Sequence, residues 1–156
     1  MPTIDVNGLD LYYEDRGEGE PLLLLHGGTG IGRDWQHVFT SGDPAGYRLI
    51  VPDLRGHGRS TNPSGRFTFR EIATDIVRLL DHLGVRHVKA IGMSAGAKTL
   101  LHVATQRPDL VDAMVLVSAT PYFPVQARAA MAQLSSSLST RRHRHSIERS
   151  PAGYGQ

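Results

Sequence analysis

Residues 92–96, Gly-Met-Ser-Ala-Gly, constrain the fold of this chain more than any other stretch. They stand between an apolar run at 88–91, typical of a buried strand, and a helix-forming run at 97–105. A strand that gives way to a helix so abruptly must turn sharply, so Ser94 is expected to adopt a strained backbone that exposes its hydroxyl. A Cβ at Gly92 or Gly96 would strike the neighbouring strand or helix. The start of the helix adds a partial positive charge and free N–H groups, which suit a developing oxyanion.

Three further stretches accompany this turn. Residues 22–28 read Leu-Leu-Leu-Leu-His-Gly-Gly, residues 53–60 read Asp-Leu-Arg-Gly-His-Gly-Arg-Ser, and residues 108–117 lead from Pro-Asp into an apolar run. Together with G-x-S-x-G at 92–96, these motifs resemble the α/β-hydrolase family over about residues 3–134. The resemblance implies an α/β fold, a mostly parallel sheet with helices on both faces. Because members of that family are usually much longer, the chain is expected to be a C-terminally truncated version.

Local patterns predict the individual elements. Asn7-Gly8 is a two-residue hairpin signal between alternating strands. Thr68 and Glu71 form a T-x-x-E capping box before a helix that stops at Gly84. Apolar runs without alternation indicate strands that are buried on both faces, as in a parallel sheet. Strands are expected at 3–6, 9–13, 22–25, 47–51, 88–91 and 114–117, and further helices around 34–35, at 95–106 and from 127 to 134.

Composition narrows the class of protein. Hydrophobic residues make up 40% of the chain and charged residues 21%, which is ordinary for a soluble protein. No apolar run approaches the roughly 20 residues of a membrane span, and the N-terminus lacks a signal-peptide pattern. The absence of cysteine excludes disulfides, thiolate metal sites and a cysteine nucleophile. These features predict a cytoplasmic protein with no membrane partner.

A change in composition divides the chain into residues 1–134, a partial α/β-hydrolase domain, and a basic tail at 135–156. The tail has few large apolar residues and no periodicity, so it is expected to be disordered. Four arginines and Glu148 give it a net charge of +3, and since the whole chain carries +2, residues 1–134 carry −1. The basicity therefore belongs to the tail, and the first 134 residues make no electrostatic case for nucleic acid.

Ser94 is the candidate catalytic nucleophile. The resemblance implies an oxyanion hole formed by the backbone N–H groups of Ala95, directly after the nucleophile, and of Gly28 in the loop after the 22–25 strand. Thr29 is an alternative to Gly28, because the register of this loop is not defined by the residues alone.

Three polar residues near these motifs are expected to support loops. By the same resemblance, His26 braces the oxyanion loop rather than acting as a base. Asp53 and His57 likewise fix the loop in which they lie rather than taking part in the chemistry.

A serine hydroxyl becomes a nucleophile beside a base, which in turn needs an orienting carboxylate. In the family that the chain resembles, both partners follow the serine, in the order Ser, acid, His. The histidines after Ser94 are His102, His143 and His145, and the acids are Asp109, Asp112 and Glu148. His102 falls within the helix after the turn, and both aspartates are expected to precede the last strand, at the opposite edge of the sheet. The triad acid and histidine are thus not found.

The sequence also contains incomplete versions of motifs that are typical of other classes of protein. Residues 92–99 miss the nucleotide-binding P-loop pattern G-x-x-x-x-G-K-[ST] by one residue, because Ala97 replaces the second glycine. Residues 28–32 miss the dinucleotide-binding pattern G-x-G-x-x-G because Arg33 replaces the last glycine, although Asp53 is placed for a ribose contact. A third alternative is a catalytically inactive fragment or pseudo-hydrolase.

The sequence therefore predicts a serine hydrolase that cleaves an ester or similar acyl compound through an acyl-Ser94 intermediate, without cofactor or metal. Its partner is a small ester-like substrate rather than nucleic acid or membrane. Because the acid and histidine are not found, the activity is expected to be impaired. A bare edge on the last strand and uncovered apolar surface would favour a homo-oligomer.

Overall fold

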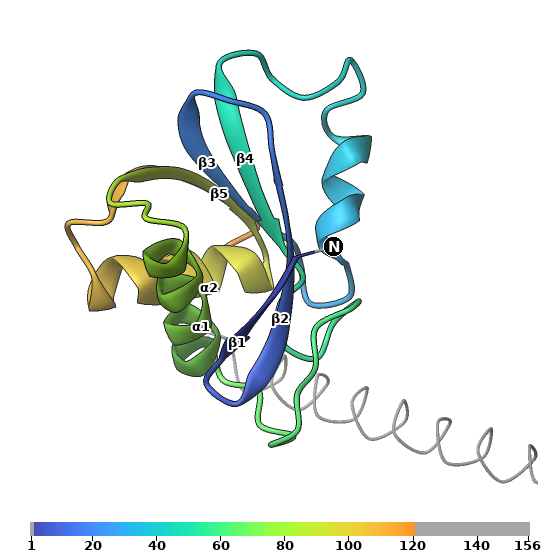
Figure 1. The fold of residues 1–156 in the computed structure, drawn as a ribbon, viewed down its shortest axis with the longest axis vertical. Coiled ribbons are helices and arrows are strands. Elements are labelled where there is room, and N and C mark those ends of the chain that lie inside the picture. Colours follow the sequence, from blue (N-terminus) through green and yellow to red (C-terminus); the bar gives the residue numbers. More distant parts are fainter. Residues whose placement is uncertain (1, 121–156) are drawn as a thin grey trace, which may run out of the picture. The chain divides into compact units, whose positions relative to one another are not determined.

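The computed structural model describes residues 2–120, and the predicted helix at 127–134 and tail at 135–156 lie outside this part. Six strands form one sheet in the order β1-β2-β4-β3-β5-β6 (Figure 1). The strands are β1 (Thr3–Val6), β2 (Leu9–Arg16), β3 (Glu20–Leu25), β4 (Tyr47–Pro52), β5 (Val88–Met93) and β6 (Val111–Val117). The helices are the 3₁₀ helix η1 (Gly32–His37), α1 (Phe69–His82) and α2 (Ala95–Gln106).

The sheet joins an antiparallel N-terminal hairpin to a parallel body. β1 pairs antiparallel with β2, and β2 with β4, whereas β4, β3, β5 and β6 run parallel. Asn7 and Gly8 form the hairpin turn with φ angles of 51° and 73°, in the left-handed region that this dipeptide tolerates. β3 and β5 end side by side, with Leu25 opposite Gly92, so the loops that follow them meet at one edge of the sheet.

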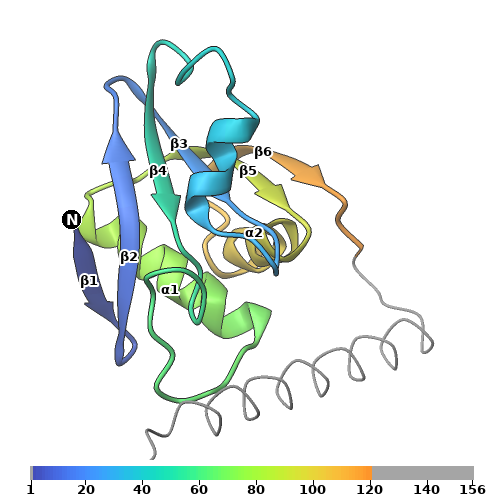
Figure 2. The same ribbon diagram turned by 90° about the vertical axis from the view of Figure 1, so that its right-hand side faces the viewer.

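Helices α1 and α2 cover one face of the sheet, and the main core lies between them and the strands (Figure 2). Its fully buried aliphatic side chains include Leu11, Leu23, Leu25 and Ile50 from the sheet, Ile72, Ile76, Leu79 and Leu80 from α1, and Leu100 from α2. Burying one such side chain stabilises a fold by about 1.5–3 kcal/mol. This layer therefore fixes the helix α2 that begins next to Ser94.

The 3₁₀ helix η1 covers the opposite face. Trp35 packs there against Leu22, Leu24, Leu49 and Val51. Alternate residues of β3 thus face the two layers, so all four leucines at 22–25 are buried. The expected α/β fold, with a mostly parallel sheet and helices on both faces, is confirmed.

Helix α1 begins and ends as its sequence predicts. The Thr68 side chain caps it by accepting a hydrogen bond from the backbone N–H of Glu71 (3.2 Å). At the other end Gly84 has φ 68°, and Val85 N–H donates to the Leu80 carbonyl (2.9 Å). This closing pattern depends on a left-handed residue, which glycine supplies without strain.

A buried ion pair fastens the loop after β4 to α1. Arg55 donates from Nε and Nη2 to the two carboxylate oxygens of Asp75 (2.7 and 2.8 Å), and Asn7 Nδ2 donates to the same carboxylate (2.6 Å). Both charged side chains are almost fully buried. Separating the two side chains would leave each of them as an unpaired buried charge, which is costly. The ion pair therefore holds the loop at 53–60 against α1.

Strand β6 departs from expectation. A buried strand is predicted at 114–117, but β6 spans Val111–Val117 and is largely exposed, with Val115 at 56%. Within residues 2–120 it pairs only with β5 and lies at the edge of the sheet. An apolar run therefore indicates the strand correctly but not its burial, which depends on what lies beside it.

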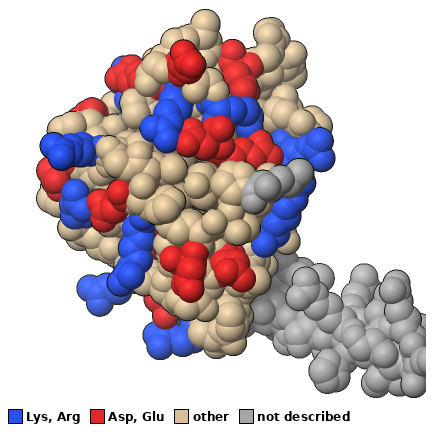
Figure 3. Space-filling model, in the orientation of Figure 1, with Lys and Arg blue, Asp and Glu red and all other residues tan. Residues whose placement is uncertain are grey.

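The surface of the described residues shows no single-sign charge over the face in Figure 3, where basic and acidic side chains are interspersed. No helix between residues 2 and 120 combines the length and the apolar character that crossing a membrane requires. This face therefore lacks the continuous basic surface that phosphate backbones bind.

Candidate active site

Ser94 is the single residue between the end of β5 and the start of α2. Its backbone has φ 50° and ψ −103°, a left-handed conformation that costs a non-glycine residue about 1–3 kcal/mol. The Ser94 N–H donates to the Val117 carbonyl at the end of β6 (2.8 Å), and the Ser94 carbonyl accepts from Lys98 N–H (3.1 Å) in the first turn of α2. Both ends of the residue are thus fixed while the residue itself is exposed. The sharp strand-to-helix turn is present as predicted.

The two glycines of the turn are required by close backbone contacts. A Cβ on Gly92 would lie 2.7 Å from the backbone of Gly96 and Ala97, at the start of the helix. A Cβ on Gly96 would lie 2.2 Å from the Leu25 carbonyl oxygen, at the end of β3. Gly96 N–H also donates to the His26 carbonyl (3.1 Å), which joins the turn to the loop after β3.

The loop after β3 passes close to Ser94 and Ala95. A Cβ built on Gly27 would lie 3.8 Å from Ser94 Cβ, and one built on Gly28 would lie 3.6 Å from Ala95 Cβ. The N–H groups of Gly28 and Ala95 have no acceptor within residues 2–120. Two unpaired donors next to an exposed hydroxyl are the arrangement that stabilises an oxyanion. The assignment of this oxyanion hole stays a prediction.

His26 is held by hydrogen bonds on both ring nitrogens. Its Nε2 accepts from Leu54 N–H (2.9 Å), so Nδ1 carries the proton and donates to the Gly27 carbonyl (2.7 Å). Burial lowers the pKa of this ring, which keeps it neutral. With its basic lone pair already used, His26 has none to accept a proton from Ser94. The bond to the Gly27 carbonyl orients the peptide whose N–H belongs to Gly28.

Asp53 and His57 also connect loops. Asp53 accepts from the backbone N–H groups of Gly32 (2.7 Å) and Arg59 (2.9 Å) and is buried, so its carboxylate is not exposed to a ribose. The His57 ring places Nε2 2.8 Å from the Gly28 carbonyl. The loop after β4 thereby supports the loop that carries Gly28.

Within residues 2–120 the acids and the histidine that follow Ser94 do not form a triad with it. His102 stacks on Phe69 with 6.4 Å between ring centres. Asp112 lies 3.1 Å from His87 Nδ1, at the end of β5 and β6 opposite Ser94. Asp112 lies inside β6 rather than before it, because the strand begins at Val111 and not at the predicted residue 114. As expected, it lies far from Ser94. The remaining candidates, His143, His145 and Glu148, lie outside the described residues.

A cavity of ≈ 220 Å³ lies beside the turn, and sequence reasoning did not foresee its walls. It is lined by His26, Gly27, Thr29, Gly30, Asp34, Trp35 and Met93. The buried Trp35 Nε1 has no hydrogen-bond partner among the described residues. Trp35 and Met93 contribute apolar side chains to its wall, and His26, Thr29 and Asp34 contribute polar ones. No cluster of three metal-ligating side chains occurs between residues 2 and 120.

The geometry at 92–99 does not support a P-loop. The helix begins at Ala95, so these residues form a tight turn rather than a wide loop around a phosphate. Lys98 Nζ lies 5.4 Å from the centre of the Phe69 ring, and burial lowers the pKa of its ammonium group. Thr99 Oγ1 donates to the Ala95 carbonyl within the helix (3.0 Å).

The fold, the sharp turn and the glycine-rich loop define an α/β hydrolase. The family model for the alpha/beta hydrolase fold matches residues 20–142, and the chain belongs to this family. Epoxide hydrolase 3 of Siraitia grosvenorii is 36% identical over 118 residues, which are 74% of this chain and 37% of that protein. A non-heme haloperoxidase of Rhodococcus erythropolis is 32% identical over 131 residues, 83% of this chain and 48% of that protein.

Solved structures agree with this assignment. Est816, described as an N-acyl homoserine lactone degrading enzyme, is similar with a TM-score of 0.73 at 30% identity, over 84% of this chain and 52% of that chain. The chain spans between 37% and 48% of the length of the two curated relatives above. Its ancestry is therefore that of α/β hydrolases, matched over the part that contains the 92–96 turn and the glycine-rich loop after β3.

Proposed function

We propose that Ser94 is the nucleophile of a serine-hydrolase site for carboxylic esters or related acyl compounds. Its Oγ attacks the carbonyl carbon, the oxyanion binds the N–H groups of Ala95 and Gly28, and the alcohol leaves to give acyl-Ser94. Water then releases the acid and restores the hydroxyl. The observation that carries this proposal is an exposed serine held at φ 50° beside two unpaired N–H groups.

The chemistry of serine favours acyl compounds over the epoxides named for several relatives. Attack of a serine oxygen on an epoxide carbon would form an ether, which has no carbonyl for water to attack and would remain on the protein. An acyl-serine ester is hydrolysed through a second oxyanion in the same place. A lactone, as named for Est816, is a cyclic ester and fits this chemistry.

The activity is proposed to be impaired, because no base for Ser94 is found within residues 2–120. Loss of triad residues in an enzyme of this mechanism costs about 10⁶ in kcat, and the oxyanion hole with binding retains roughly 10³–10⁴ over water. A residual reaction through Ser94 is therefore expected to be slow.

The test measures p-nitrophenyl acetate hydrolysis by the full chain and by Ser94→Ala, with and without added imidazole as a replacement base. The rate of the native chain minus that of the variant is expected to be far below that of ordinary esterases and to rise with imidazole. Styrene oxide offered in place of the ester should not be turned over.

Labelling separates the proposal from an inactive fragment. A fluorophosphonate probe followed by mass spectrometry should modify Ser94 in the folded chain and not after denaturation. Absence of any Ser94-dependent label or rate would support a pseudo-hydrolase. A Ser94-dependent rate within about tenfold of ordinary esterases would show that a working base exists.

A further inference from the structure

The His57 ring lies between two backbone carbonyl groups. Its Nδ1 is 3.0 Å from the Arg55 carbonyl oxygen, and its Nε2 is 2.8 Å from the Gly28 carbonyl oxygen. A carbonyl oxygen only accepts hydrogen bonds, so each ring nitrogen must carry a proton to bond to it. A neutral imidazole has one N–H, whereas the charged imidazolium has two. Both contacts are therefore hydrogen bonds only when His57 is charged.

The neighbouring His26 ring has a different set of partners. Its Nε2 faces a donor, the Leu54 N–H, and its Nδ1 faces an acceptor, the Gly27 carbonyl. One proton satisfies both contacts, so this ring is complete in its neutral form. The centres of the two histidine rings are 5.2 Å apart. Of the two rings, only His57 has partners that require a charge.

Gly28 is held on both sides by these two histidines. His26 binds the carbonyl of the peptide whose N–H belongs to Gly28, and His57 binds the carbonyl of the next peptide. Glycine adopts a wider range of backbone conformations than other residues, so the direction of its N–H is defined only where both neighbouring peptides are fixed. This N–H is one of the two donors of the oxyanion hole in the proposed function.

We propose that charged His57 is a positioning residue for the oxyanion hole, and that Gly28 becomes more mobile when His57 loses its proton. A neutral ring turns a lone pair towards one of the two carbonyl oxygens, and the two lone pairs repel each other. Whichever bond remains, the ring no longer connects Gly28 firmly to the 53–60 loop. Because histidine changes charge between about pH 5 and 8, the Gly28 N–H is held better in mildly acidic than in mildly basic solution.

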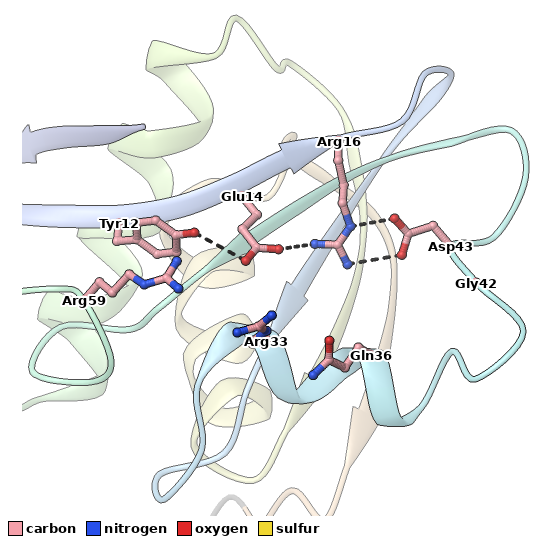
Figure 4. A pocket seen from close by; sticks show the side chains of 8 residues that line it. All are labelled: Tyr12, Glu14, Arg16, Arg33, Gln36, Gly42, Asp43 and Arg59. Carbon is pink, nitrogen blue, oxygen red and sulfur yellow. Dashed lines mark hydrogen bonds and ion pairs between the residues drawn. The ribbon is translucent and has the colours of Figure 1, made fainter. Parts of the chain in front are cut away.

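The charged side chains that accompany His57 in the 53–60 loop have partners of their own. Arg55 forms the buried ion pair with α1. The Arg59 guanidinium lies 4.5 Å from the centre of the Tyr12 ring, beside a cavity of ≈ 540 Å³ on the η1 side of the sheet (Figure 4). Asp53 accepts from two backbone N–H groups. No carboxylate within residues 2–120 forms an ion pair with His57, so its nitrogen partners are the two carbonyl oxygens.

The first test is ¹⁵N relaxation of the full chain at about pH 5.5 and at about pH 8, which reports how firmly the Gly28 and Thr29 N–H groups are held. Their order parameters should be about 0.85 at the lower pH, as in rigid backbone, and clearly smaller at the higher pH. In His57→Phe, whose ring has no donor, they should be small at both. His102→Phe, which replaces an exposed histidine of α2, is the matched control and should behave as the native chain does.

The native chain alone decides the first comparison. A loss of order at the higher pH that His57→Phe does not show supports the proposal. Equal order parameters at the two pH values in the native chain, or the same loss of order in His57→Phe, would overturn it.

The effect on catalysis rests on the proposed function and has a separate measurement. The rate at which the fluorophosphonate probe labels Ser94 is compared between the native chain and His57→Phe at each pH, so that the pH dependence of the serine itself cancels in the ratio. The native chain should be labelled at least about tenfold faster at the lower pH, and the ratio should approach one at the higher pH.

The two measurements keep the two proposals apart. The expected order parameters without any labelling of Ser94 would contradict the proposed function and still support the positioning of Gly28 by His57. A labelled Ser94 with the same ratio at both pH values would overturn the role of His57 in the oxyanion hole.

Discussion

Ser94 combines a fixed backbone in a strained conformation with an exposed side chain. The hydrogen bond to the Val117 carbonyl and the start of α2 hold it at φ 50°, where a Cβ is strained. The strain keeps the hydroxyl outside the sheet, and the core under α2 offsets its cost.

This strain predicts the stability of two variants. Ser94→Gly should exceed Ser94→Ala in free energy of unfolding by about 1 kcal/mol, because glycine adopts positive φ without steric cost. Urea denaturation of both variants measures the difference. Ala104→Gly, within α2, is the control and should lose about 1 kcal/mol, since glycine destabilises an ordinary helix position. Equal stability of the two Ser94 variants would show that the turn is not strained.

His26 predicts a pH dependence. Burial lowers its pKa in the folded chain, whereas a histidine in the unfolded chain titrates at about 6.5. Below that pH the unfolded chain binds a proton that the folded chain does not, so the free energy of unfolding should fall as the pH drops through 6.5 towards the folded pKa. His26→Gln keeps one donor and one acceptor but cannot titrate.

The measurement is urea denaturation of the native chain and of His26→Gln at several values between pH 7.5 and 5.5. The native chain should lose more stability over this interval than the variant, and the other histidines cancel in the comparison. Parallel curves would mean that His26 is protonated as easily in the folded chain as in the unfolded one.

The contact between α2 and β3 depends on Gly96. A methyl group there would meet the Leu25 carbonyl at 2.2 Å, so strand or helix would have to move. Gly96→Ala should therefore destabilise the chain by about 3 kcal/mol or more. Gly27→Ala is the matched control, since its Cβ would lie 3.8 Å from the nearest atoms, and it should change stability little. Thermal denaturation followed by circular dichroism tests both, and similar losses would contradict the close packing at Gly96.

Elements governed by sequence neighbours were predictable. The turn at Asn7-Gly8 and the cap at Thr68 need only residues within one turn of each other, and both are present. The 92–96 turn was predictable for the same reason. The exposure of β6 was not, because burial of an apolar strand depends on which elements lie beside it.

In the candidate site, too, residues of local motifs could be predicted and residues brought together by packing could not. Ser94 and Gly28 belong to local motifs, so sequence reasoning could name them, whereas Trp35 enters the adjoining cavity only through the packing of η1. The cavity lined by Arg16, Arg33 and Arg59 could not be predicted either, since these residues lie far apart in the chain. Their proximity follows from β2 lying next to β4 and from η1 covering that face.

At the level of the whole molecule, the sheet formed by residues 2–120 ends at β6, which has exposed apolar side chains. Met114, Val115 and Val117 are 38%, 56% and 40% exposed, and Met114 and Val115 border an apolar cavity of ≈ 340 Å³. An exposed apolar edge strand is a template for pairing with another chain. The full chain is therefore predicted to self-associate with increasing concentration.

Light scattering coupled to size exclusion, at a series of concentrations, measures this association. Val115→Lys should lower the apparent mass, because a charge on an edge strand must be desolvated when the strand pairs. Val38→Lys is the matched control: this valine is 54% exposed but follows η1 and belongs to no strand, so its replacement should leave association unchanged. A monodisperse monomer at all concentrations, or equal masses for the Val115 variant and the native chain, would contradict association through β6.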